Sequence, residues 1–121
     1  MTFQKKRPVI KRIADSLAGL RSGWRREPSI RAHLLASTIA LVAMAAVRPP
    51  LAWSLAAIGA LAISLTAEYF NAAIEALLDK LHPALDSEIG AAKDMASAAA
   101  FILNCLATGA CLAALGAGAL A

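Results

Sequence analysis

The chain begins with an amphipathic stretch, which predicts a surface helix. From Val9 to about Arg26, apolar residues recur at spacings of three or four, so they form one stripe along a helix. The stripe consists of Ile10, Ile13, Leu17, Leu20 and Trp24. Basic residues surround it and a tryptophan ends it, a pattern typical of a helix lying on a membrane surface. A soluble helix packed on a partner protein is the alternative.

Three long apolar stretches follow and predict membrane-spanning helices. They cover about residues 30–47, 51–80 and 92–115, where a bilayer core requires about 20 residues. Prolines at two breaks precede the first two spans, and a polar loop over 81–91 precedes the third. Three glycines predict a loosely helical far end of the last span: Gly109, Gly116 and Gly118. We therefore expect an all-α membrane protein with one domain over residues 1–121.

Composition and charge support this interpretation. The chain is 60% hydrophobic and 17% charged, whereas about 25% charge is usual for a soluble domain. Nine of the twelve Lys and Arg residues precede position 32, which predicts a cytoplasmic N-terminus and, after three spans, a C-terminus outside. We expect the basic arm to contact anionic lipid head groups rather than nucleic acid. We expect no cleavable signal peptide and no Cys/His zinc site.

A polar face ends the second span. Seventeen uncharged residues precede Glu68, and Asn71, Glu75 and Asp79 then share with it an arc of about 80° on the helix. Carboxylates next to hydrocarbon are costly, so such a cluster is a candidate functional site. The predicted orientation gathers this face and Glu27 at the cytoplasmic surface.

These residue types suit phosphoryl transfer. Glu27, Glu75 and Asp79 offer hard oxygen ligands for Mg²⁺ shared with substrate phosphates. Lys93 can meet a phosphate as a point charge, and Asn71 can orient a hydroxyl. Glu68 lies deepest and is the candidate proton acceptor. Because the chain has no Gly-rich Walker loop, metal and side chains would have to hold the nucleotide.

Other polar residues in the spans have structural interpretations. We expect Asn104 and Thr108 to form hydrogen bonds between helices. His33 is expected near the membrane interface. Lys93 and Asp94, taken by themselves, could simply open the third span.

Two motifs resemble those of a known family. Residues 68–79 read E-Y-F-N-A-A-I-E-A-L-L-D, and residues 92–99 read A-K-D-M-A-S-A-A. Together they resemble the small bacterial integral-membrane diacylglycerol kinases, over a stretch from about Ser16 to Ala99. The resemblance implies homotrimers of three-span protomers with a surface helix. It also implies an enzyme of the inner membrane, with a cytoplasmic active site, that phosphorylates a lipid hydroxyl from Mg-ATP.

The same resemblance implies roles for single residues. Glu68 matches the family's proton acceptor, which is also a lipid contact. Asn71 matches a residue beside the reacting hydroxyl. Glu27 and Glu75 match its metal carboxylates. The positions matching nucleotide contacts are Glu27, Glu75, Asp79, Lys93, Asp94 and Ser16. The further positions matching lipid contacts are Trp24, Arg31 and Ser97.

The chain also departs from the family pattern. Residues 84–86 lack a Glu-Tyr-His run near the nucleotide, Asp15 stands where an aromatic residue is common, and Pro8 stands where a basic residue is expected. Residues 31–33, Arg-Ala-His, resemble the sister enzymes that phosphorylate undecaprenol, whereas residues 95–99 favour diacylglycerol. Both lipids therefore remain candidate substrates.

Two other classes of function remain open from the sequence. A small proton-coupled exporter would use Glu68 as its ion relay. Such an exporter would need its carboxylate near mid-membrane, whereas here the acids gather at one surface. A non-catalytic membrane scaffold would leave the acidic face without a purpose.

Overall fold

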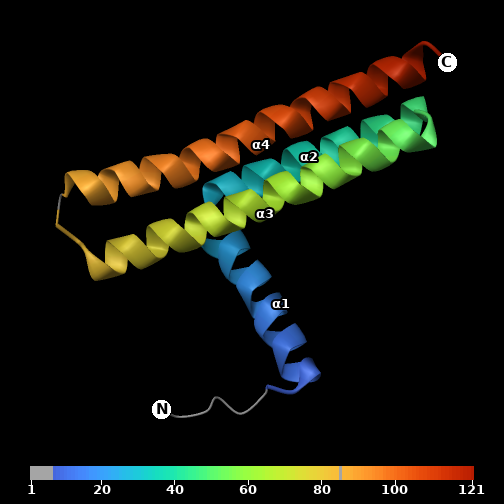
Figure 1. The fold of residues 1–121 in the computed structure, drawn as a ribbon. Coiled ribbons are helices and arrows are strands. Elements are labelled where there is room, and N and C mark those ends of the chain that lie inside the picture. Colours follow the sequence, from blue (N-terminus) through green and yellow to red (C-terminus); the bar gives the residue numbers. More distant parts are fainter. Residues whose placement is uncertain (1–6, 85) are drawn as a thin grey trace.

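The computed structural model describes residues 7–84 and 86–121, which form four helices and, over these ranges, no strand. The helices are α1 (Val9–Arg26), α2 (Pro28–Val47), α3 (Leu51–Leu81) and α4 (Ser87–Ala119). α2, α3 and α4 lie side by side in a bundle, and α1 projects from it (Figure 1). The predicted all-α fold is confirmed. Lys5 and Lys6 of the predicted basic arm, and residue 85 of the 84–86 departure, lie outside the described residues.

The break between α1 and α2 lies at Glu27. Its backbone is extended (φ −109°, ψ 109°), and its N–H donates to the carbonyl of Gly23 and so closes α1. Pro28 occupies the first position of α2, where its missing N–H would have had no helical partner. α2 therefore begins two residues before the predicted span.

The connection between α3 and α4 is shorter than predicted. The Asp86 carboxylate accepts from the backbone N–H groups of Glu88 at 2.9 Å and Ile89 at 3.1 Å. Such an N-cap satisfies helix donors that otherwise have no partner, so α4 begins at Ser87. The prediction of a polar loop reaching Ala91 was wrong.

The far end of α4 is also more regular than predicted. It stays α-helical to Ala119, so the expectation of a loosely helical end was wrong. A Cβ added at Gly118 would lie 2.6 Å from Val47 Cγ1 and 3.1 Å from the Pro49 backbone. The absent side chain lets α4 pack directly on the turn between α2 and α3, and this contact supports the helix.

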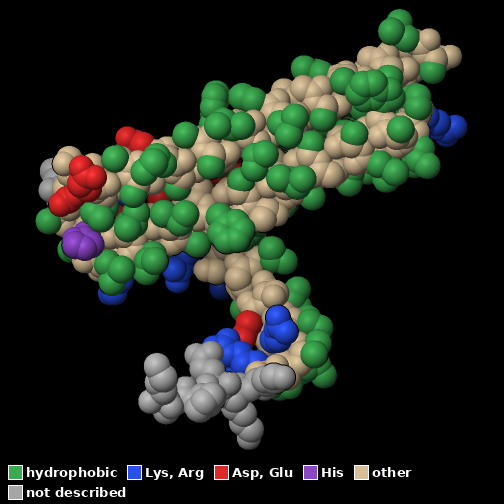
Figure 2. Space-filling view, in the orientation of Figure 1, with side chains coloured by type: hydrophobic (Ala, Val, Ile, Leu, Met, Phe, Trp, Pro, Cys, Tyr) green, Lys and Arg blue, Asp and Glu red, His purple; other side chains and the backbone are tan. Residues whose placement is uncertain are grey.

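Small residues form the core of the bundle. α4 packs mainly against α3, and the buried cluster consists of Met44, Ala57, Cys111 and Ala114. Small side chains let helices approach closely, as in membrane proteins. α2, α3 and α4 are long and apolar enough to cross a membrane. Hydrophobic side chains cover the long face of the bundle in Figure 2, and acidic ones gather at the end where α3 turns into α4.

Candidate active site

The predicted polar face lines a cavity of about 410 Å³ at one level of the bundle. Glu68, Asn71 and Glu75 reach it from α3, Glu27 from the break between α1 and α2, and Ser97 from α4. Glu27 lies about 40 positions before Glu68 in sequence, so only the folded chain brings these carboxylates to one cavity. The structure thus assembles five of the residues that the sequence analysis selected.

A second, larger cavity adjoins the first. It has a volume of about 610 Å³, and mainly alanine, leucine and isoleucine side chains of α2, α3 and α4 line it. Three residues line both cavities: Ser29, Glu68 and Asn104. Glu68 therefore lies where a polar cavity meets an apolar one.

The Glu68 carboxylate is buried and has a direct partner on α4. Glu68 is 8% exposed. Asn104 Nδ2 donates a hydrogen bond to Glu68 Oε1 at 2.6 Å. Asn104 Oδ1 in turn accepts from the hydroxyl of Ser64. Ser64 is fully buried and lies on α3 one turn before Glu68, on the same helix face.

The polar contacts continue from Ser64 to α2. His33 Nε2 lies 3.0 Å from Ser64 Oγ, and His33 Nδ1 lies 3.1 Å from Ser37 Oγ. From the sequence, His33 was expected near the membrane interface and Asn104 was expected only to bond between helices, so this connection to Glu68 was not predicted. The available signal was that polar residues interrupt apolar spans, with Ser64 four positions before Glu68.

Asn71 has one unsatisfied polar atom. Its Nδ2 donates a long hydrogen bond of 3.4 Å to Glu75 Oε1. Its Oδ1 is buried and has no hydrogen-bond partner among residues 7–84 and 86–121. A buried acceptor without a donor is costly. Asn71 also lines the polar cavity, so this unpaired acceptor belongs to a residue of the candidate site.

The predicted nucleotide contacts toward the α3–α4 connection are exposed. Lys93 Nζ lies 2.7 Å from Asp79 Oδ1, in a pair whose side chains are 33% and 65% exposed. Exposed pairs contribute little to stability, so a phosphate can compete for Lys93. Asp94 is exposed as well and is not among the residues that line the polar cavity.

The predicted site residues near α1 have local partners. Arg31 Nη1 donates to the backbone carbonyls of Trp24 at 2.9 Å and Arg25 at 3.3 Å, and so holds the end of α1. The Ser16 hydroxyl donates to the carbonyl of Arg12 at 2.9 Å. The structure does not bring Ser16 or Trp24 to the polar cavity.

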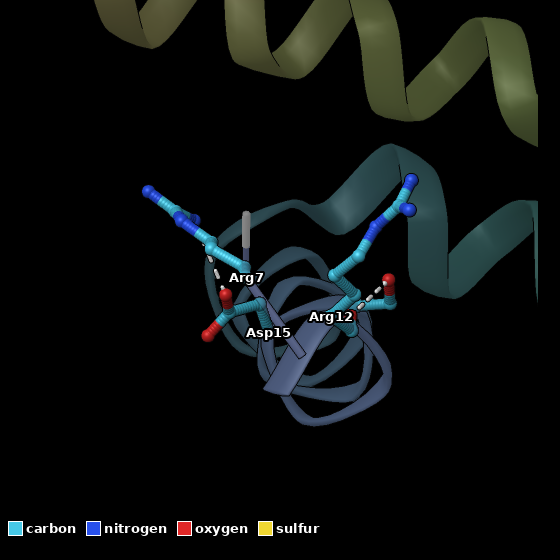
Figure 3. A network of polar contacts seen from close by, with 4 residues as sticks. Arg7, Arg12 and Asp15 are labelled. Carbon is cyan, nitrogen blue, oxygen red and sulfur yellow. Dashed lines mark hydrogen bonds and ion pairs between the residues drawn. The ribbon is translucent and has the colours of Figure 1, made fainter. Parts of the chain in front are cut away.

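The unusual Asp15 also has a partner. Arg7 Nη1 lies 3.3 Å from Asp15 Oδ2, and both side chains are exposed (Figure 3). The acid on α1 thus faces the basic residue next to Pro8.

The oxygen donors of the polar cavity suit Mg²⁺ that arrives with phosphates. In the part of the chain that the structure describes, no three His, Cys, Asp or Glu residues form a group that could hold a metal alone. Mg²⁺, however, commonly binds through one or two carboxylates together with substrate phosphates. Glu27 and Glu75 line one cavity, so together they could hold such an ion.

Comparison with known proteins gives a family. The family model described as prokaryotic diacylglycerol kinase matches residues 14–115. The match spans most of the chain and includes every residue that lines the polar cavity. Among curated proteins, no match is found.

Proposed function

Because the chain belongs to the prokaryotic diacylglycerol kinase family, a family of membrane lipid kinases, we propose that it transfers the γ-phosphate of ATP to the hydroxyl of a membrane lipid. The first substrate that we propose is diacylglycerol, which would yield phosphatidic acid. The observation that carries the proposal is the position of Glu68, a buried carboxylate in the wall between a polar and an apolar cavity. Family membership also favours a kinase over an exporter or a scaffold.

The two cavities suit the two halves of the reaction. A lipid's acyl chains have apolar surface to bury, which the larger cavity offers, and its hydroxyl would then meet Glu68. Phosphates carry charge and suit the polar cavity, which two other carboxylates and two amides line. Phosphoryl transfer depends mainly on positioning and on electrostatic stabilisation, so this division supplies most of what the reaction needs.

Glu68 is the proposed general base. One of its oxygens, Oε1, accepts from Asn104 at 2.6 Å, so Oε2 is the oxygen that we assign to the substrate. The lipid oxygen would form a bond to the γ-phosphorus while the bond from this phosphorus to the bridging oxygen of ADP breaks. The hydroxyl proton would move to Glu68, and ADP would leave.

The neighbouring residues would orient the reactants. Asn71 lines the polar cavity together with Glu68, so its side chain would lie beside the reacting hydroxyl. Lys93 can leave its exposed pair with Asp79 and meet a phosphate. Glu27 and Glu75 would hold Mg²⁺, which when bound neutralises phosphate charge.

The same proposal includes a location and an assembly. No residue of α1 is buried, and its apolar stripe lies open, which supports a helix that rests on a bilayer. Nine early cationic residues support a cytoplasmic N-terminus in the inner membrane, next to anionic lipid head groups. We propose a homotrimer, which the resemblance of residues 68–79 and 92–99 implies.

A lipid phosphorylation assay tests the proposal. The purified full-length chain in lipid vesicles would receive Mg-ATP with a labelled γ-phosphate and either dioleoylglycerol or undecaprenol. We expect label in phosphatidic acid, and none when Glu68→Gln replaces the native chain. Label only in undecaprenyl phosphate would select the sister activity, which the Arg-Ala-His sequence at residues 31–33 resembles. The absence of label in both lipids would refute the kinase.

A further inference from the structure

The polar contacts behind Glu68 form a chain of hydrogen bonds that all run in one direction. A carboxylate can only accept, so Asn104 Nδ2 is the donor to Glu68, and Asn104 Oδ1 accepts from Ser64. That bond uses the only polar hydrogen of Ser64. Ser64 Oγ must therefore accept from His33 Nε2, which lies 3.0 Å away.

This accounting also assigns the histidine tautomer. In the tautomer that has its hydrogen on Nε2, His33 Nδ1 accepts from the Ser37 hydroxyl at 3.1 Å. The donors thus follow one another from Ser37 on α2 through Ser64 on α3 and Asn104 on α4 to Glu68. Hydrogen bonds aligned in this way polarise and strengthen one another. The last of them acts on the carboxylate of Glu68.

We propose that this chain positions the base, so that Asn104, and His33 behind it, are positioning residues of the kinase. The inference rests on the function proposed for Glu68 above. A carboxylate turns easily about its last bond. The 2.6 Å bond from Asn104 fixes that rotation and directs the other oxygen to the cavities.

Other hydroxyls in the bundle behave differently. Thr38, Thr66 and Thr108 each donate to the carbonyl four residues earlier in their own helix. That arrangement is the usual way to satisfy a hydroxyl in an apolar helix. Ser64 and Asn104 instead donate across helices, and their bonds end on the carboxylate that lines both cavities.

Steady-state kinetics of single variants test the inference in the full-length protein, with dioleoylglycerol vesicles and Mg-ATP. Asn104→Leu should lower kcat at least about ten-fold, because a misplacement of about 1 Å can cost about 100-fold. Ser64→Ala and His33→Leu, which break the chain further from Glu68, should lower kcat less. Asn104 and His33 also line the cavity proposed for the lipid, so the test of positioning is that kcat falls by a larger factor than KM rises for either substrate.

Three comparisons separate positioning from a structural bond. His33→Gln should restore most of the turnover that His33→Leu loses, because a glutamine amide can donate from nearly the place of Nε2. Thr66→Val, which removes a hydroxyl on α3 close to Glu68 that bonds its own helix, should keep native kcat. The third comparison uses Glu68→Asp, whose shorter side chain no longer reaches Asn104. In that background Asn104→Leu should cause no further loss.

The outcomes are distinct. Native kcat in Asn104→Leu, or an equal loss in the Glu68→Asp background, would overturn the inference and leave a structural bond. If Asn104→Leu does not assemble, Ser64→Ala, which removes a single oxygen atom, serves in the same comparison. Native turnover in Glu68→Gln would instead refute the function proposed for Glu68 itself.

Discussion

Replacing Gly23 with alanine should loosen α1 from the bundle. A Cβ at this position would lie 2.2 Å from Tyr69 Cε1 and 2.9 Å from Ile30 Cδ1. The isoleucine methyl can turn away, but the tyrosine ring is rigid. It also anchors α1, because its hydroxyl donates to the Leu20 carbonyl at 2.8 Å.

The size of the effect follows from these distances. To reach ordinary contact at about 3.4 Å, the Tyr69 ring must retreat by about 1.2 Å, which would carry its hydroxyl beyond hydrogen-bond range of Leu20. Losing that bond costs about 1 kcal/mol, and the overpacking costs about 1–3 kcal/mol. The total of about 2–4 kcal/mol corresponds to a shift of roughly 30- to 1,000-fold toward undocked α1.

Amide hydrogen exchange of the protein in bilayers measures this opening. The amides of α1 should exchange faster in Gly23→Ala by a factor of this order, while those of α3 and α4 keep their native rates. Turnover should fall as well, because Glu27 at the end of α1 lines the polar cavity. Gly19→Ala is the control: a Cβ there meets no atom within 4 Å, so exchange should be unchanged or slower. Native exchange and turnover in Gly23→Ala would refute the reasoning.

Three further predictions concern the site and the orientation. Glu68→Gln should lower turnover at least about 100-fold, measured as phosphatidic acid formed, while Mg-ATP binding measured by calorimetry stays native. Glu75→Gln should keep the fold by circular dichroism but weaken Mg-ATP binding and nearly abolish turnover, and full activity would exclude Glu75 as a metal ligand. A cysteine introduced at Asp86 should react with an impermeant reagent only from the cytoplasm, and one near Pro49 only from outside; labelling of position 86 from the periplasm would reverse the orientation.

Much of the fold could be predicted because it depends on local chemistry. The break at Glu27-Pro28 follows from the restrictions that a proline imposes on its neighbours. The Asp86 cap is equally local, since an aspartate followed by Ser87 and Glu88 is a typical helix start. The prediction of a loop over residues 81–91 did not use this signal. The end of α4 was mispredicted for another reason. The space that Gly118 leaves is filled by Val47 and Pro49, which lie far away in sequence.

The candidate site divides in the same way. Glu68, Asn71 and Glu75 could be grouped because 3.6-residue periodicity alone places them on one helix face. The contact between Asn104 and Glu68 depends on how far α4 is shifted along α3. If α4 paired with α3 one residue out of this register, Asn104 would point about 100° away from Glu68. No local pattern fixes this register in an alanine-rich pair of helices, so the partner of Glu68 was visible only in the structure.

The end of the candidate site proposed for the nucleotide is open to solvent, because one copy of this short chain cannot enclose it. One copy surrounds the polar cavity with Glu27, the first turn of α2 and side chains of α3 and α4. Its remaining charged candidates, Asp79, Lys93 and Asp94, lie on the exposed end of the α3–α4 hairpin. Excluding water from a transferring phosphate requires further surfaces, because an exposed charge is screened and stabilises a transition state poorly. The bilayer can cover apolar surface but offers no such groups, so other copies of the chain are the source that we propose for the missing enclosure.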